Sequence, residues 1–385
     1  MRFRPVGAAL AALILAACAT ATPTPPPVSA PAPPATAPLP PPSTFLDFSR
    51  LPGWAEDDHA AAFAAFRETC GATRDRGLAQ VCRRARSLGP LDAVAARGFF
   101  EANFRAESVG ADGVLTAYFA PEYAARTTPD AEFSAPLRAR PADLSVVDAG
   151  MFDPLQAGKP GAAMVVAGQV LPYPDRAGIE AMTPEQVLAW MRPEELFFLQ
   201  IQGSGVVTFE SGRRMKAVYA ANNGKPFVGI ANPMRDRGLL AGADTSGEAI
   251  RAWLADHRGP EAQAIMQLNP RYVFFSLAPD DGRQPVGSAG VPLAPGRSIA
   301  VDPTRHAMGE LFWLDARAPI LAGAFPAYRR LVMALDTGGA IKGDVRADLY
   351  LGLGARAGAE AGRVRHALRL YRLAPLVDLP GGPTS

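Results

Sequence analysis

Two aspartates near the C-terminal end, Asp336 and Asp348, have surroundings that suit acid–base chemistry. Asp336 ends the apolar, strand-like run Leu331–Leu335 and is followed by Thr-Gly-Gly, where the missing side chains let the backbone turn. Asp348 directly precedes Leu349 and Tyr350, which begin another strand-like run. Two carboxylates at the ends of adjacent predicted strands, around a glycine-rich loop, indicate a cleft rather than a solvated surface.

Neutral polar side chains form a second candidate binding feature, in the segment Phe197–Ser204. If this segment is a strand, alternation places Phe198, Gln200, Gln202 and Ser204 on one face, and the strand ends in Gly203-Ser204-Gly205. Amides and hydroxyls donate and accept hydrogen bonds, so they match sugar hydroxyls without the cost of desolvating a charge. Asn223, in a polar turn at 219–227, has the same amide character. The alternative is an ordinary amphipathic edge strand.

The remaining pattern predicts helices first and mostly short strands afterwards. Apolar residues on helical spacing indicate two helices within 55–105. Later segments predict further strands and helices, and the last segment, 363–373, fits either a helix or a strand. The predicted strands are 114–118, 163–170, 271–277 and 298–301, and the predicted helices are 183–191, 246–258 and 260–268. Asp302 follows the strand 298–301 and is a third carboxylate at a strand end.

The N-terminus carries the pattern of a bacterial lipoprotein signal. Arg2 and Arg4 precede a short apolar stretch that ends in Leu-Ala-Ala-Cys at Cys18, which is similar to a lipobox. The resemblance implies that Cys18 is lipidated and becomes the new N-terminus; an ordinary secreted protein with a chance cysteine is the alternative. Ala19 follows the cysteine, and this favours sorting to the periplasmic face of the outer membrane.

Residues 19–43 predict a tether. They are rich in Pro and contain no charged residue, so they cannot bury a core and favour an extended polyproline-like chain. At about 3.1 Å per residue such a chain reaches on the order of 70 Å. A lipid anchor with a spacer of this reach suits a target away from the membrane, and the cell-wall polymer is the obvious candidate.

Charge and cysteine content exclude several classes of function. The chain has 39 basic and 37 acidic residues, and without Arg2 and Arg4 the two counts are equal, so nucleic acid binding is not expected. Cys70 and Cys82 favour a disulfide in an oxidising periplasm over a redox pair, which prefers Cys-x-x-Cys. The four histidines are scattered without zinc-type spacing, so we expect no metal and no cofactor.

Six segments in order resemble the membrane-bound lytic murein transglycosylase A family, including its C-terminal three-aspartate domain. The resemblance covers nearly all of the chain from about residue 45. The final motif is highly specific, QxQGSG is moderately so, and the others mainly confirm the order. The segments are LTAYFAPEY (115–123), FFLQIQGSG (197–205), YAANNGKPF (219–227), NPRYVFF (269–275), VPLAPGRSIAVDP (291–303) and ALDTGGAIKGDVRADLYLG (334–352).

The resemblance implies a fold and an activity. The fold is mainly β with flanking helices (α+β): a double-psi β-barrel from 44–118 plus 245–385, and an inserted β domain at 119–244, with a glycan groove between them. The activity is non-hydrolytic cleavage of the β-1,4 bond between N-acetylmuramic acid and N-acetylglucosamine in peptidoglycan, leaving 1,6-anhydromuramoyl ends. Partners beyond glycan strands and the outer-membrane anchor are not predicted.

The family's catalytic acid maps onto Asp348, its second aspartate onto Asp336 and its Asp-Pro aspartate onto Asp302. Tyr118 and the amides named above are the expected substrate contacts. Hydrolytic glycosidases need two carboxylates, whereas the tethered C6 hydroxyl of the sugar replaces water here, so one acid suffices.

That acid must start protonated, so we expect burial or a neighbouring carboxylate to raise its pKa. Lys342 could instead lower this pKa or bind substrate. For Asp336 and Asp302 a purely structural role is as acceptable as chemistry, and a strand-cap role for Asp348 is a weaker alternative. A two-carboxylate hydrolase and a non-catalytic wall-binding lipoprotein are the competing functions.

Overall fold

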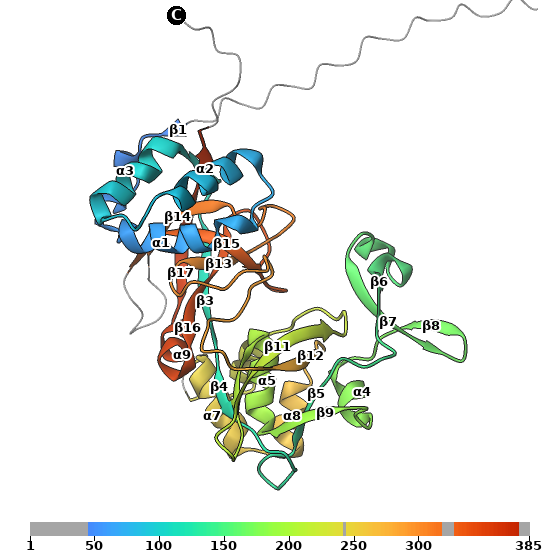
Figure 1. The fold of residues 1–385 in the computed structure, drawn as a ribbon. Coiled ribbons are helices and arrows are strands. Elements are labelled where there is room, and N and C mark those ends of the chain that lie inside the picture. Colours follow the sequence, from blue (N-terminus) through green and yellow to red (C-terminus); the bar gives the residue numbers. More distant parts are fainter. Residues whose placement is uncertain (1–44, 242–243, 318–326, 377–385) are drawn as a thin grey trace, which may run out of the picture. The chain divides into compact units, whose positions relative to one another are not determined.

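The computed structural model describes residues 45–241, 244–317 and 327–376 (Figure 1). Its central feature is a closed barrel of six strands in the order β17-β14-β15-β13-β16-β3, in which β3 pairs again with β17. The parallel pairs β13–β15 and β16–β3 interrupt an otherwise antiparallel ring. The expected double-psi barrel of an α+β protein is therefore present. The strands are β3 Gly113–Ala120, β13 Ser298–Val301, β14 Leu311–Arg317, β15 Ala327–Thr337, β16 Arg346–Leu353 and β17 Arg365–Pro375.

Alternation along the barrel strands divides the core into two layers. Phe312 and Leu314 of β14 belong to one buried cluster with Leu115 and Leu349, while Trp313 belongs to the other. The second cluster also contains the apolar faces of the N-terminal helices, so these helices cover one outer side of the barrel. Both faces of β14 are buried, which explains its continuous apolar sequence.

The N-terminal helices begin at aspartates. α1 His59–Thr69, α2 Arg76–Ser87 and α3 Ala93–Asn103 are each capped by the preceding Asp side chain, which accepts a backbone N–H. The helices predicted within 55–105 are thus confirmed. Cys70 and Cys82 form a disulfide with a Cα–Cα distance of 5.5 Å. The short strand β1 Phe45–Leu46 pairs with β2 Phe104–Ser108, and β2 pairs in turn with β17.

The rest of the described chain builds a second group of small sheets and helices. Its main sheet has the order β12-β11-β10-β4. Strands β5 and β9 form a two-stranded antiparallel sheet, and β6, β7 and β8 form a separate arm (Figure 1). The strands are β4 Glu122–Ala124, β5 Ala135–Arg138, β6 Ser145–Asp148, β7 Pro160–Val166, β8 Gln169–Pro172, β9 Val187–Met191, β10 Gly205–Thr208, β11 Arg214–Asn222 and β12 Val273–Pro279. The helices of this group are α4 Arg176–Ala181, α5 Pro193–Gln202, α6 Ala231–Asp236, α7 Gly247–Asp256 and α8 Pro260–Met266. Helix α9 Gly354–Ala361 follows the barrel strand β16.

The division between the predicted domains at residue 244 stays a prediction. In the structure the main sheet of the second group extends to β12, and α7 and α8 pack with α5 and α6 in one apolar cluster. Single 3-10 turns complete the described secondary structure: η1 Phe48–Arg50, η2 Trp54–Glu56, η3 Cys70–Ala72, η4 Ala149–Met151 and η5 Pro154–Gln156.

Three local predictions were wrong. The segment Phe197–Ser204 is not a strand but the end of helix α5, which starts with Pro193 and Glu194 and ends at Gly203 in the left-handed conformation (φ 82°). Half of its ten residues are buried and none is exposed, so its sequence lacks a polar stripe and its apolar residues imitate strand alternation.

The other two concern β9 and the β7–β8 hairpin. The helix predicted for 183–191 is strand β9, which contains Val187 and Trp190 and pairs with β5. The single strand predicted for 163–170 is two strands joined by Ala167 and Gly168, both with positive φ, as a two-residue hairpin requires.

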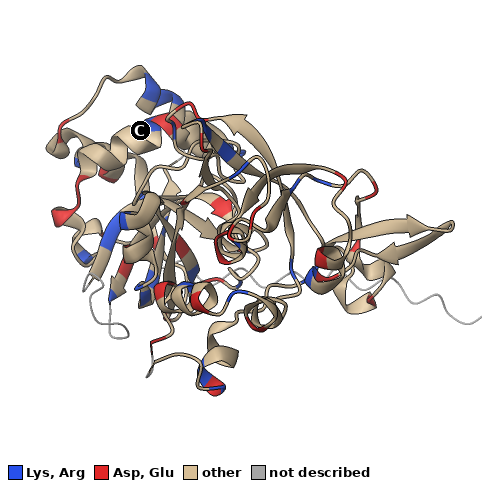
Figure 2. Ribbon diagram, turned by 90° about the horizontal axis from the view of Figure 1, so that it is seen from below, with Lys and Arg blue, Asp and Glu red and all other residues tan. Residues whose placement is uncertain are grey.

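Charged side chains of both signs are interspersed over the ribbon (Figure 2), in keeping with the nearly equal counts of basic and acidic residues. None of the described helices is long and apolar enough to span a bilayer. Cys18 and the segment 19–43 lie outside the described residues.

Candidate functional site

Four side chains line up across the barrel wall in one register row. Asp336 of β15 pairs with Ala300 of β13, Ala300 pairs with Asp348 of β16, and Asp348 pairs with Thr116 of β3. Residues paired in register project to the same face of a sheet. The two acids therefore share a face, but they are not on adjacent strands as expected, because β13 lies between them. Two strand spacings separate their backbones by roughly 9–10 Å.

Asp348 is a partly buried acid that is hydrogen-bonded by Thr116, which Arg346 supports in turn. The Thr116 hydroxyl donates a hydrogen bond to Oδ1 of Asp348, and Nη2 of Arg346 donates to the Thr116 hydroxyl at 3.0 Å. Burial raises the pKa of Asp348, while the Thr116 hydrogen bond and the Arg346 charge lower it and the Asp336 carboxylate raises it again. Burial wins, so the Asp348 carboxyl keeps its proton to a higher pH than an exposed aspartate does.

Both carboxylate oxygens of Asp336 accept hydrogen bonds from the protein. Oδ1 accepts from the Ser288 backbone N–H at 3.0 Å, the Ser288 hydroxyl at 2.7 Å and the Thr337 backbone N–H at 2.9 Å. Oδ2 accepts from the Tyr118 hydroxyl at 2.7 Å. Burial, followed by the adjacent Asp336 charge, raises the pKa of Tyr118 well above its usual value, so this hydroxyl is a donor. Asp336 is thus held in place by four hydrogen bonds.

Two adjoining hollows, of about 340 and about 540 Å³, surround these groups. The smaller contains Asp348, Thr116, Tyr118 and the small side chain of Ala300. The two hollows share seven of their lining residues, so we treat them as one groove. The shared residues are Gln202, Gly203, Tyr219, Arg271, Asp336, Thr337 and Gly339.

The structure brings most of the predicted site residues to this groove. Asp348, Asp336, Tyr118, Gln200, Gln202 and Gly203 line the smaller hollow, and Ser204 lines the larger one. The amides come from the C-terminal end of α5 rather than from a strand face. Gln200 is 5% exposed and uses its Nε2 to donate to the Val273 carbonyl at 3.2 Å. Gln202 is more open, and its Oε1 accepts from the Phe119 backbone N–H.

Asn223 lies apart from the groove. It is 1% exposed, its Nδ2 donates to the Pro174 and Pro270 carbonyls at 2.9 and 2.8 Å, and its Oδ1 accepts from the Tyr272 backbone N–H. Its amide therefore fastens three backbone segments together instead of facing a ligand.

Asp302 and Lys342 also lie outside the groove lining. Asp302 accepts from the Thr304 backbone N–H and hydroxyl and from the Gly343 backbone N–H at 2.9 Å, and Lys342 Nζ lies 3.8 Å away. Burial opposes these contacts, but together they lower the pKa of Asp302. The Asp302 carboxylate is thus bonded to the loop that connects Asp336 with Asp348 and does not face the groove.

Four groove residues were missed from the sequence. Thr116 and Arg346 each lie two residues from a predicted site residue, Tyr118 and Asp348, and the strand period of two could have identified them. Ser288 and Arg271 come from loops remote in sequence, and no local pattern points to their role.

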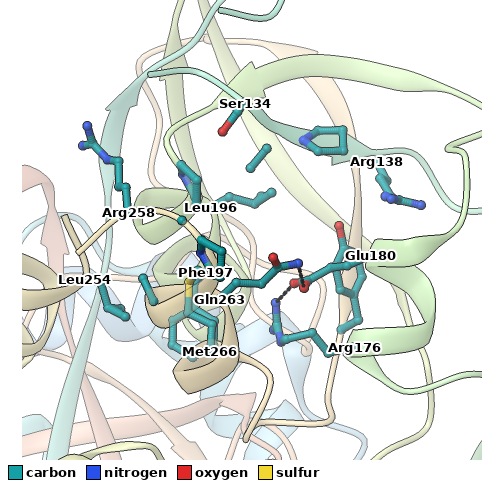
Figure 3. A pocket seen from close by; sticks show the side chains of 17 residues that line it. Ser134, Arg138, Arg176, Glu180, Leu196, Phe197, Leu254, Arg258, Gln263 and Met266 are labelled. Carbon is teal, nitrogen blue, oxygen red and sulfur yellow. Dashed lines mark hydrogen bonds and ion pairs between the residues drawn. The ribbon is translucent and has the colours of Figure 1, made fainter. Parts of the chain in front are cut away.

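A separate cavity of about 340 Å³ lies among α4, α5, α8 and β5 (Figure 3). Two of its arginines pair with acids: Nη1 of Arg176 lies 3.4 Å from Glu180, and Arg258 pairs with Glu194. Arg138 donates instead to the Met182 carbonyl at 2.9 Å. Arg176 also donates from Nε to the Asn269 carbonyl at 3.0 Å and from Nη2 to the Arg271 carbonyl at 2.7 Å. Arg176 therefore holds the backbone of the segment that carries Arg271.

Comparison with known proteins agrees with this geometry. A family model described as the MltA specific insert domain matches residues 114–276, and one described as the 3D domain matches residues 297–374. The membrane-bound lytic murein transglycosylase A of Vibrio cholerae is 31% identical over 267 residues. That match covers 68% of this chain and 65% of the relative, slightly less than two thirds of its length.

Solved structures extend the likeness to almost the whole described chain. A membrane-bound lytic murein transglycosylase from Agrobacterium tumefaciens is 32% identical, with a TM-score of 0.75, over 86% of this chain and 97% of that one. Escherichia coli MltA with bound chitohexaose is 28% identical, with a TM-score of 0.62, over 82% and 90%. With the barrel, the row of acids and the order of motifs described above, these matches show that the chain belongs to the membrane-bound lytic murein transglycosylase A family.

Proposed function

We propose that this protein is a peptidoglycan lytic transglycosylase in which Asp348 is the single acid and base. It would cleave the β-1,4 bond between N-acetylmuramic acid and N-acetylglucosamine without water and leave a 1,6-anhydromuramoyl end. The observation that carries the proposal is the unequal state of the two acids. Burial raises the pKa of Asp348, whereas both oxygens of Asp336 already accept hydrogen bonds from the protein.

The reaction needs one proton that moves out and back. Protonated Asp348 gives its proton to the glycosidic oxygen as the bond from this oxygen to C1 of the muramyl sugar breaks. The C6 hydroxyl of the same sugar then attacks C1, and the Asp348 carboxylate takes the proton of that hydroxyl. Because the nucleophile is tethered to the reacting carbon, its effective concentration is high and no second carboxylate has to activate water.

The neighbours of Asp348 fit these two roles. The hydrogen bond from Thr116 orients the carboxyl and stabilises the carboxylate that forms after the first transfer. Arg346 supports Thr116 from the other side. The Asp336 charge acts in the opposite sense and favours the protonated starting form. Asp336 is therefore a positioning and charge-tuning residue in this proposal.

The groove suits a glycan strand. Its lining combines the Gln202 amide and the Ser204 hydroxyl with the exposed ring of Tyr219, and sugars are bound by such mixtures of hydrogen-bonding groups and aromatic surfaces. E. coli MltA, the relative solved with chitohexaose, binds a sugar oligomer. We extend this to peptidoglycan strands in the groove of the present protein.

We further propose that Cys18 carries a lipid and that residues 19–43 tether the enzyme to the periplasmic face of the outer membrane. The signal-like N-terminus supports this, and the V. cholerae relative is named membrane-bound. The reach of the tether, on the order of 70 Å, would let the groove meet the wall polymer while the anchor stays in the bilayer.

Product analysis tests the activity. Purified enzyme is incubated with purified sacculi, and the released muropeptides are measured by mass spectrometry. The proposal predicts ends one water lighter than hydrolytic products. Products of full mass would instead establish the two-carboxylate hydrolase, and sacculus binding without release would establish a non-catalytic wall-binding protein.

A further inference from the structure

Arg271 brings a positive charge into the groove between its two hollows. It lies two residues before β12, is partly buried and lines both hollows. Its guanidinium lies against Gly339, in the turn that follows Asp336. A Cβ on Gly339 would lie 3.8 Å from Cζ and 3.9 Å from Nη1 of Arg271, at ordinary contact distance, so the guanidinium lies directly beside the acid loop.

This charge lacks a carboxylate partner within the described part of the chain. Nη1 donates to the Lys225 carbonyl at 3.2 Å, and this uses only one of the five N–H donors of a guanidinium. Burial lowers the pKa of Arg271. The opposing influence, which raises this pKa, comes from Tyr219 and not from a carboxylate. Arg346 and Arg176 have Asp348 and Glu180 beside them. Among the described residues the buried Arg138 also has no carboxylate partner, but it donates to the Met182 carbonyl and lies outside the groove, so Arg271 is distinguished by its place in the groove.

The position of Arg271 is fixed from behind. Its carbonyl accepts from Nη2 of Arg176 at 2.7 Å, and its N–H donates to Oδ1 of the buried Asn269. These bonds fix the backbone of Arg271, and the bond from Nη1 to the Lys225 carbonyl holds its side chain. A partly buried cation without a counter-charge is costly. Such an arrangement is typical of a group whose partner arrives with the ligand.

We infer that Arg271 binds a carboxylate carried by the glycan substrate. This inference rests on the proposed function, and it names what distinguishes the substrate from a neutral sugar polymer. A guanidinium fork matches the two oxygens of a carboxylate, whereas sugar hydroxyls offer no charge. In peptidoglycan the carboxylate has two sources, the peptide stem or, where the stem has been removed, the lactyl group of the muramyl sugar.

Binding measurements in an inactive background separate the sources. Asp348→Asn protein, with and without Arg271→Gln, is titrated with three soluble probes: peptide-bearing strands, amidase-stripped strands with a free lactyl carboxylate, and chitohexaose. We expect Arg271→Gln to weaken the binding of at least one carboxylate-bearing probe by about tenfold or more, as for a lost charged hydrogen bond, and to leave chitohexaose binding unchanged. Loss for the peptide-bearing strands alone identifies the stem, and loss for the stripped strands alone identifies the lactyl group.

Controls keep the outcomes distinct. Arg213→Gln removes an exposed arginine that lines neither hollow, so it should change none of the three affinities. Unchanged chitohexaose binding shows that the Arg271→Gln groove is intact. Equal weakening for all three probes, or no weakening for any, overturns the inference. Neither result depends on catalysis, so failure of the proposed activity is detected separately, by the absence of anhydro products from the unmodified enzyme.

Discussion

The Tyr118 hydroxyl donates a 2.7 Å hydrogen bond to Oδ2 of Asp336 and thereby joins β3 to β15 across the faces of β13 and β16. Two residues earlier on the same strand, Thr116 donates to Asp348. Strand β3 therefore supplies one hydroxyl to each acid, and both hydroxyls lie on the face that lines the groove. The two acids are tied to a common strand although they come from different ones.

Tyr118→Phe tests this link. The substitution removes a partly buried hydrogen bond to a carboxylate, so we expect the free energy of unfolding to fall by about 1–3 kcal/mol, measured by urea denaturation. Activity should fall less than in Asp348→Asn, because Asp336 keeps its three bonds from Ser288 and Thr337. Unchanged stability would show that the bond contributes nothing.

Asp348→Asn should lower the rate of anhydromuropeptide release by at least about a hundredfold, since an amide can neither give nor take the proton. Stability should not fall, because the substitution removes a group whose charged form is penalised by burial. Asp344→Asn is the matched control: this aspartate is exposed, lies in the loop between Asp336 and Asp348, and its carboxylate pairs with the exposed Arg305. A fully active Asp348→Asn enzyme would refute the assignment.

The pH profile should respond to the neighbours of Asp348 in opposite directions. The reaction starts from protonated Asp348, so activity is present below its raised pKa and is lost as pH rises through it. Arg346→Gln removes a positive charge that lowers this pKa, so the alkaline limb should move to higher pH. Asp336→Asn removes a negative charge that raises it, so the limb should move to lower pH. The rate of anhydromuropeptide release is measured from pH 4 to 9 for both variants. A shift of the alkaline limb in the same direction in both variants would contradict the scheme.

Gln202 and Asn223 were predicted together as substrate contacts, and the structure separates them. Gln202→Ala should raise KM by up to about tenfold, the value of one neutral hydrogen bond, with little change in stability. Asn223→Ala should leave KM unchanged and lower the free energy of unfolding by about 1–3 kcal/mol, because buried backbone groups lose their partners. The two substitutions serve as controls for each other in paired kinetic and urea experiments.

Cys18→Ala tests the anchor. We expect the variant to lose fatty-acid labelling and to move from the membrane fraction to the soluble fraction, while the purified protein retains activity on sacculi. Membrane association that survives the substitution would indicate that another part of the protein holds it there.

The presence of both acids in one groove was predictable because they lie in a short motif. Asp336 and Asp348 lie twelve residues apart with a glycine turn between them, and their strands follow from local apolar runs. The barrel strand between the acids was not predictable in this way. β13 enters between β15 and β16 through a parallel pairing to a segment more than thirty residues away, and such non-local pairing leaves no local pattern.

The error at α5 has a different cause. Phe197, Leu199 and Gln200 are all buried against different neighbours, so the period that separates a helix from a strand is lost. Pro193, the acidic first turn and Gly203 were the better signals, since they mark the ends of a helix whatever its faces contact. Gln202 reaches the groove because it is the last residue before the Gly203 cap.

The strand β3 also has a mechanical consequence. It ends at Ala120, and after Pro121 the chain continues directly into β4 of the second sheet, where the Pro121 carbonyl accepts from the Val206 backbone N–H at 2.8 Å. The residues that hold both acids thus lie on a covalent connection between the two sheets that line the groove. A change in the direction of β3 at Pro121 would therefore move both hydroxyl donors together, so that the hydrogen bonds to Asp336 and Asp348 change as a pair.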